Sequence, residues 1–221
     1  DATSTESDNY IWLYAIDGDY TRNSDGIQTA VFTGYGVLTD GTKVSYEIAT
    51  DAENDDYYFE GADKSEDTKL GSLSGNSVTV SKKSAVIAYS VNSDDQLVYE
   101  DAADTIKWQR THDTVDKENA KIGDAYATSD TVFIFGDIDD TGVDVSLSTG
   151  YRNVDIKSSA SLTTIADEDG NALYVFVKAA NGSLSSDDMY AVLLDEDAVV
   201  TKEDGDTFYT YTVYTDGQET E

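Results

Sequence analysis

Carboxylates are the residues of this chain that could do chemistry, and they come in short runs. The chain has 45 Asp and Glu against 14 Lys and Arg, with one His, no Cys and a formal net charge of −31. Carboxylate oxygens are hard ligands, and Ca²⁺ prefers sites where several such oxygens lie close together. Calcium is therefore the one candidate cofactor, and no motif requires another. Its candidate ligands lie in the runs at 137–140 and 167–169, namely Asp137, Asp139, Asp140, Asp167 and Asp169.

The run at 137–142 begins like an EF-hand loop, with acids at alternate positions before Gly142. An EF-hand also needs a bidentate Glu six residues after its Gly, and that position is Ser148. The EF-hand is therefore rejected, which leaves a calcium site of another kind. The alternative is that Asp and Gly only form tight turns here, because both residues accept the backbone angles of turns.

A catalytic set is hard to assemble from this sequence. His112 stands alone beside Asp113, and the chain has no Gly-x-Ser-x-Gly nucleophile elbow. Two facing carboxylates could hydrolyse a glycoside, but so many acids place some pair at any separation by chance. Their concentration in predicted turns also favours solvated carboxylates with ordinary acidity. We therefore predict that the protein is not an enzyme.

The charge excludes two classes of partner. Nucleic acids and anionic membranes bind clusters of Lys and Arg, and this acidic chain repels both. No apolar run reaches the roughly 18 residues that indicate a membrane span. Divalent cations, basic partners or high-salt surroundings fit the charge, and so does the simpler role of keeping the protein soluble. The lack of Cys removes disulfides, thiolate zinc sites and thiol catalysis.

Short strand patterns separated by turn residues predict an all-β fold. Residues 27–38 and 43–49 flank an Asp-Gly turn at 39–42, and a similar hairpin is expected around 167–171. No apolar stripe of helical period is sustained, so 102–122 is expected to be a long connection with at most a short helix. We predict antiparallel sheets in sandwich-like or barrel-like layers, forming two lobes.

The two lobes are expected to meet in a linker at 149–160. A boundary near residue 157 gives a larger N-terminal lobe, 1–157, and a smaller C-terminal lobe, 158–221. Within the smaller lobe, 207–214 is predicted to be one strand, with bulky residues on both faces.

The two ends of the chain are those expected of a mature or excised piece. The N-terminus has neither an initiator Met nor a charged-then-apolar leader. Residues 216–221 are interpreted as a turn whose next strand is missing. Either the chain is cut from a longer protein, or a neighbouring subunit supplies that strand by β-augmentation, with the polar arm 1–9 as a candidate donor.

Aromatic residues offer a second kind of binding chemistry, because Tyr and Trp rings can stack on sugars. The candidate platforms for a glycan are Tyr57, Tyr58, Phe59, Trp108, Tyr209 and Tyr211. Packing in a core or an interface is the alternative, since aromatic residues are enriched in strands.

Four stretches in the second half of the chain share a recognisable pattern: 127–135, 148–156, 172–177 and 203–211. Together they resemble the acidic, β-rich modules of large surface proteins of Gram-positive anaerobes that carry S-layer homology domains. That pattern usually has Pro shortly after Gly-Tyr-x-Asn-Val, where this chain has Asp155. No S-layer homology domain is recognised here, so attachment to wall polymer is not carried over. The resemblance implies extracellular, cell-surface residence and a structural or display role.

The expected function is therefore that of a non-enzymatic structural module of a bacterial cell-surface protein, as an S-layer-like, fibre or stalk building block. Its expected partners are copies of itself or neighbouring surface modules. Two alternatives stay open: an adhesin or glycan-binding module, and an accessory domain of a large secreted enzyme.

Overall fold

The computed structural model describes most of the first 180 residues and several short strands after them. The described residues are 9–22, 24–100, 106–111, 114–139, 142–154, 156, 160–180, 192–193, 199–203, 206–210, 213–215 and 218–220; side chains are not described at 106–111, 139, 179–180 or beyond residue 191. The chain divides into two compact units, Asp1–Ser183 and Leu184–Glu221. Each unit is described by itself.

A closed barrel occupies the first part of the larger unit, with the strand order β1-β2-β3-β9-β8. Strand β8 returns after a long connection to lie beside β1, which makes the barrel a Greek key. All neighbours are antiparallel except β3 and β9, which pair in parallel at Ile48 and Leu97. The barrel strands are β1 (Tyr10–Arg22), β2 (Gln28–Leu38), β3 (Lys43–Ile48), β8 (Ala85–Val91) and β9 (Leu97–Glu100).

The hairpin between β2 and β3 follows the predicted Asp-Gly turn. Gly41 has φ +82°, which glycine adopts without the steric cost of a Cβ. The Leu38 N–H donates to the Thr42 carbonyl at 2.9 Å, and Asp40 Oδ1 accepts from the Thr42 N–H at 2.9 Å. The turn therefore sets the register of both strands from local sequence alone.

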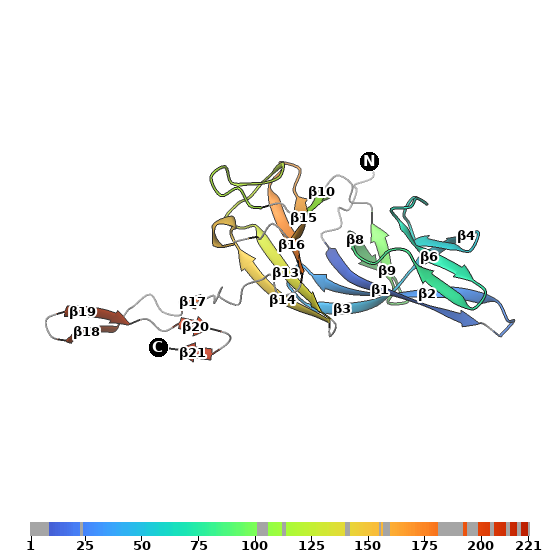
Figure 1. The fold of residues 1–221 in the computed structure, drawn as a ribbon, viewed down its shortest axis with the longest axis horizontal. Coiled ribbons are helices and arrows are strands. Elements are labelled where there is room, and N and C mark those ends of the chain that lie inside the picture. The colour runs from blue at the N-terminus through green and yellow to red at the C-terminus, as the bar shows by residue number, and fades with distance from the viewer. Residues whose placement is uncertain are drawn as a thin grey trace. The chain divides into compact units, whose positions relative to one another are not determined.

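A second antiparallel sheet fills the connection between β3 and β8 and packs against the far halves of β1 and β2 (Figure 1). Its close approach requires glycine: a Cβ on Gly71 would lie 2.9 Å from the buried Phe32 ring. The Tyr57 hydroxyl accepts from the Ala30 N–H at 3.0 Å and ties the two layers together. The strands are β4 (Thr50–Glu53), β5 (Asp56–Phe59), β6 (Lys69–Ser74) and β7 (Ser77–Val80).

The third sheet, in the order β10-β15-β16-β13-β14, completes the larger unit. Strands β13 and β16 run parallel, and the other pairs are antiparallel. Its strands are β10 (Ile106–Thr111), β13 (Val132–Asp139), β14 (Gly142–Thr149), β15 (Ser161–Ala166) and β16 (Ala172–Ala180); a small hairpin of β11 (Lys121–Ile122) and β12 (Ala125–Tyr126) and the 3₁₀ helix η1 (Tyr151–Asn153) accompany it.

The all-β prediction is confirmed, with antiparallel sheets and a barrel as the layers. Two finer expectations are corrected. The stretch 102–122, expected to be a connection, contributes β10 to the third sheet. Residue 157, the predicted lobe boundary, lies between β14 and β15, two strands of one sheet.

The barrel and the third sheet share an apolar interface. Trp12 and Val37 from the barrel pack with Ile134 and Phe176 from the sheet, and all four are buried. The rings of Trp12 and Phe176 lie 6.4 Å apart between centroids. Gly136 on β13 makes room for the indole, because a Cβ there would lie 2.5 Å from Trp12 Cη2 and closer still to Cζ3.

The smaller unit consists of short strands: β17 (Val192–Leu193), β18 (Val199–Glu203), β19 (Asp206–Thr210), β20 (Val213–Thr215) and β21 (Gln218–Thr220). The single strand predicted at 207–214 is wrong, because β19 pairs with β18 whereas β20 pairs with β17 and β21. The strand expected to be missing after residue 215 is present as β21. The candidate donor arm, apart from Asn9, lies outside the described residues.

We predict that Gly136→Ala destabilises the protein by about 1–3 kcal/mol, because the added methyl group overpacks the interface. In a Trp12→Leu background the same substitution should cost clearly less, since the ring atoms it meets are gone. Denaturant unfolding of the wild type, both single variants and the double variant measures this coupling. Strictly additive losses would contradict the contact between Trp12 and Gly136.

Candidate functional site

The predicted calcium ligands fall into two separate groups. Asp137 and Asp139 lie on β13, whereas Asp167 and Asp169 lie in the turn between β15 and β16. Asp137 pairs with Ala179 at one end of the parallel β13–β16 pair. The 167–171 turn adjoins the opposite end of this pair, where Val132 faces Tyr174. Five residues of strand separate these ends, which is about 17 Å. The two groups therefore cannot share one ion.

The 137–140 group is only partly described. Asp140 lies outside the described residues, and of Asp139 only the backbone is described. No group of three or more His, Cys, Asp or Glu poised for a metal is found within the described part of the chain. Calcium binding stays a prediction.

Several carboxylates instead hold their own turns together. Asp167 accepts from the Asn171 backbone N–H at 2.8 Å and from its side-chain Nδ2 at 3.0 Å. Asp116 accepts from the backbone and side chain of Asn119 in the same way, at 3.0 and 2.8 Å. These bonds favour the charged form, and in both cases the Asn side chain lowers the pKa of the carboxyl most. Turn formation therefore accounts for Asp167 without a metal.

Two hollows open beside the turn at 128–131, which precedes β13. The first, the Asp hollow, has a volume of about 390 Å³. Two carboxylates and an amide lie beside apolar side chains in its lining, which consists of Thr128, Asp130, Val132, Asp167, Asn171, Ala172, Leu173 and Tyr174. Thr131 closes this end of the sheet by donating from Oγ1 to the Ala172 carbonyl at 2.7 Å.

The second hollow, the Arg hollow, measures about 450 Å³ and is lined by Ser129, Gly150, Tyr151, Arg152 and Asn153. Gly150 makes the turn possible, because its φ is +86° and a Cβ would lie 3.1 Å from the Ser129 carbonyl oxygen. Its N–H donates to the Thr131 carbonyl at 2.9 Å, which joins the two turns. Sequence reasoning missed this site, since it assigned 149–160 to a linker.

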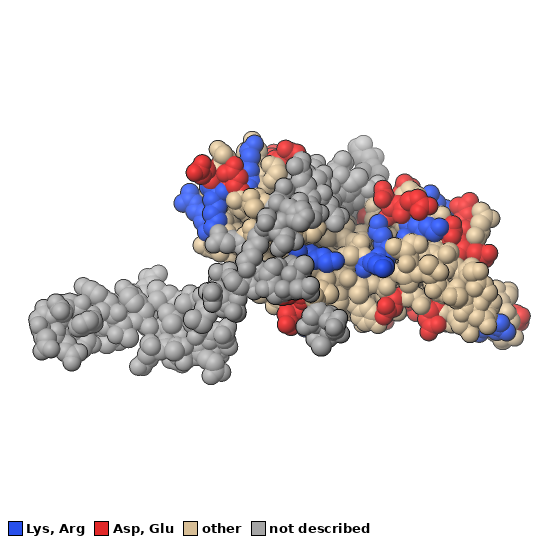
Figure 2. All heavy atoms as spheres, in the orientation of Figure 1, with Lys and Arg blue, Asp and Glu red and all other residues tan. Residues whose placement is uncertain are grey.

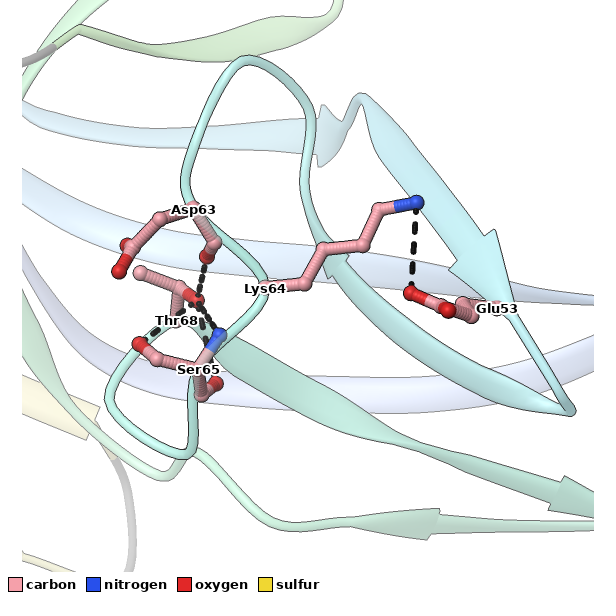
Figure 3. A network of polar contacts seen from close by, with 5 residues as sticks. All are labelled: Glu53, Asp63, Lys64, Ser65 and Thr68. Atoms are coloured by element: carbon pink, nitrogen blue, oxygen red, sulfur yellow. Dashed lines mark hydrogen bonds and ion pairs between the residues drawn. The ribbon is translucent and has the colours of Figure 1, made fainter.

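Apart from the two hollows, a polar network orders the loop between β5 and β6 (Figure 3). The Thr68 hydroxyl donates to the carbonyls of Asp63 and Ser65 and accepts from the Ser65 N–H. Lys64 Nζ lies 3.6 Å from Glu53 Oε2, and both side chains are solvent-exposed. Such an exposed ion pair contributes little, so the network stabilises a loop and forms no binding site by itself.

The aromatic platforms proposed for a glycan are partly corrected. Tyr57 and Phe59 are only 6% and 1% exposed and belong to the core of the barrel and its covering sheet, and Tyr58 is half-buried. The side chains of Trp108, Tyr209 and Tyr211 lie outside the described residues, as do His112 and Asp113. A more exposed aromatic ring lies beside the Asp hollow. Tyr126, whose backbone pairs with Asn171 of that lining, is 51% exposed, and Lys121 Nζ lies 5.1 Å from its ring centroid.

Comparison with known proteins gives no relative. The chain matches no protein-family model, no curated protein and no solved structure. Among the residues that the structure describes, no helix is both long and apolar enough to cross a membrane.

We predict that Asn171→Ala raises the pKa of Asp167 toward its ordinary value of 3.8, because the largest cause of the lowered pKa is removed. A depressed carboxyl pKa adds stability above its unfolded value and loses it as the pH falls through the folded pKa. The variant should therefore lose this contribution at a higher pH than the wild type. Carboxyl NMR titration measures the shift, with Asp40 as the control, since its pKa is lowered by Thr42 instead. An unchanged Asp167 titration would refute the assignment.

Proposed function

We propose that this chain is a non-enzymatic structural module of a bacterial cell-surface protein, an S-layer-like, fibre or stalk building block that acts through protein–protein contacts. The observation that carries the proposal is the buried interface between the barrel and the third sheet. The barrel and the third sheet share a buried apolar interface through Trp12, Phe176 and Gly136, so most of the larger unit forms one stiff body. Such stiffness suits a part that holds a fixed distance between neighbours.

The use of the acidic residues supports the same proposal. Asp40, Asp116 and Asp167 accept hydrogen bonds within their own turns, which makes them scaffold residues and leaves them poor candidates for general acids. Acidic side chains occur over several parts of the visible surface and do not form one patch (Figure 2). A catalytic acid normally needs burial or a nearby carboxylate to raise its pKa, and these three pKa values are lowered.

The charge also suggests how such a module would respond to its surroundings. A net charge of −31 opposes close packing of copies, and cations or basic groups would relieve that repulsion. Contacts between modules are then expected to depend on divalent ions and on the few cationic side chains. This expectation connects the proposed function to the calcium hypothesis.

Calcium at about 5 mM should raise the melting temperature by about 3–6 °C relative to chelator, if the site binds with a Kd near a tenth of that concentration. Calorimetry at fixed ionic strength measures the change, with Mg²⁺ as the control for general screening. Asp137→Asn/Asp139→Asn and Asp167→Asn/Asp169→Asn variants identify which group binds. An equal melting temperature in calcium and in chelator would count against bound calcium.

Electron microscopy of the purified chain with calcium tests the function itself. Ordered lattices or filaments are the expected result, because a building block repeats its contacts. A particle that stays monomeric at every protein concentration and is retained on a glycan array would instead support the adhesin alternative.

A further inference from the structure

Among the described cations, two lysines make ion pairs with carboxylates, and Arg152 does not. Lys64 and Lys69 each lie within 4 Å of a carboxylate, at Glu53 and Asp56. Lys43 donates to the Val143 carbonyl at 3.2 Å. Arg152 has no carboxylate within ion-pair distance among the described residues, although the chain has 45 acids. Its positive charge is therefore not neutralised by a described carboxylate.

A neighbouring ring holds the Arg152 side chain in place. Its guanidinium carbon lies 5.6 Å from the centroid of the Tyr151 ring, and its Nε donates to the Tyr151 hydroxyl at 3.1 Å. Guanidinium has five N–H donors in a planar fork, so four remain on the two Nη atoms. Stacking and the Nε bond restrict the side chain before any ligand arrives, which lowers the entropic cost of binding.

The Arg hollow offers room for a ligand beside these donors. Its volume of about 450 Å³ exceeds that of a carboxylate side chain, and its wall includes Ser129 and Asn153. Asn153 is fixed in its turn by donating from Nδ2 to the Thr149 carbonyl at 2.8 Å. The hollow therefore combines a positive charge, an ordered polar wall and an aromatic ring on a rigid turn.

We propose that the Arg hollow binds the carboxylate of an Asp or Glu side chain from a second copy of this chain. Arginine matches carboxylate with two parallel N–H···O bonds, which gives geometric selection as well as charge. Charge complementarity points to a second copy, because a molecule with 45 acids and 14 cations presents carboxylates on its exposed turns, as at Glu168 and Asp169. The inference rests on the proposed function and names one contact that would carry it.

Self-repulsion does not exclude such a contact at physiological salt. The Debye length there is about 8 Å, so most charges of two touching copies are screened from one another, while a contact ion pair is screened less. Association should therefore be stronger at about 0.15 M salt than at low salt, where the net charge of −31 acts over a longer range.

NMR titration of the isotope-labelled full chain tests the chemistry of the hollow. The probe is N-acetyl-glutamate methylamide, and its uncharged control is N-acetyl-glutamine methylamide. The glutamate probe should shift the Arg152 Nε–H and the amides of Tyr151 and Asn153, and the glutamine probe should not. Arg152→Ala should abolish these shifts. Absent shifts, or equal shifts with both probes, would overturn the carboxylate site.

Sedimentation equilibrium tests the second copy as the occupant. Arg152→Ala should weaken self-association by about two- to fivefold, the usual range for losing one exposed ion pair. Arg22→Ala is the matched control, since it also removes one exposed positive charge but lies at the end of β1. Arg152→Lys should recover only part of the loss, because Lys lacks the fork.

The outcomes separate the two proposals. If the chain assembles and the Arg152→Ala and Arg22→Ala variants associate equally, this contact is wrong and the proposed function stands. If the wild type stays monomeric at every concentration, the second-copy occupant falls together with the proposed function.

Discussion

The fit of Trp12 against Gly136 is the contact on which the larger unit depends. The indole is 3% exposed and lies between the barrel and the third sheet, near the rings of Tyr14 and Phe176. Removing a buried Trp side chain typically costs about 3–5 kcal/mol, which is a large part of the stability of an ordinary domain. The absence of a Cβ at one position of β13 thus decides how closely two layers approach.

This contact also explains how function would follow from structure. A barrel that closes on itself has few free edges, and the third sheet packs one face against it through a shared buried cluster, so we expect the two to move as one body. The turns at 128–131 and 150–153 that form the Arg hollow lie on this scaffold. A rigid scaffold with a preset cationic turn is what repeated contacts between surface modules would need.

Local sequence predicted the parts of the fold that local sequence determines. The Asp-Gly turn at 40–41 and the Asp167–Asn171 turn produce their hairpins through hydrogen bonds a few residues long. The parallel pairs β3–β9 and β13–β16 join residues far apart in the chain, and no turn signal encodes them. For the same reason β10 was not expected to enter the third sheet.

The candidate site was missed for a similar reason. Gly150, Tyr151 and Arg152 looked like a linker, because a turn with polar residues has no periodic pattern. Their arrangement becomes visible only when the Gly150 N–H meets the Thr131 carbonyl and brings Ser129 alongside. The runs of acids predicted calcium ligands at 137–140 and at 167–169. The structure places Asp137 and Asp139 on β13, and the length of that strand keeps the two groups apart.

Native-state hydrogen exchange tests most directly whether the barrel and the third sheet form one body. If they do, the slowest amides of β1, β2, β13 and β16 should exchange with the same opening free energy and the same dependence on denaturant. Exchange of the third sheet through a lower-energy opening, while the barrel stays protected, would contradict a single rigid module.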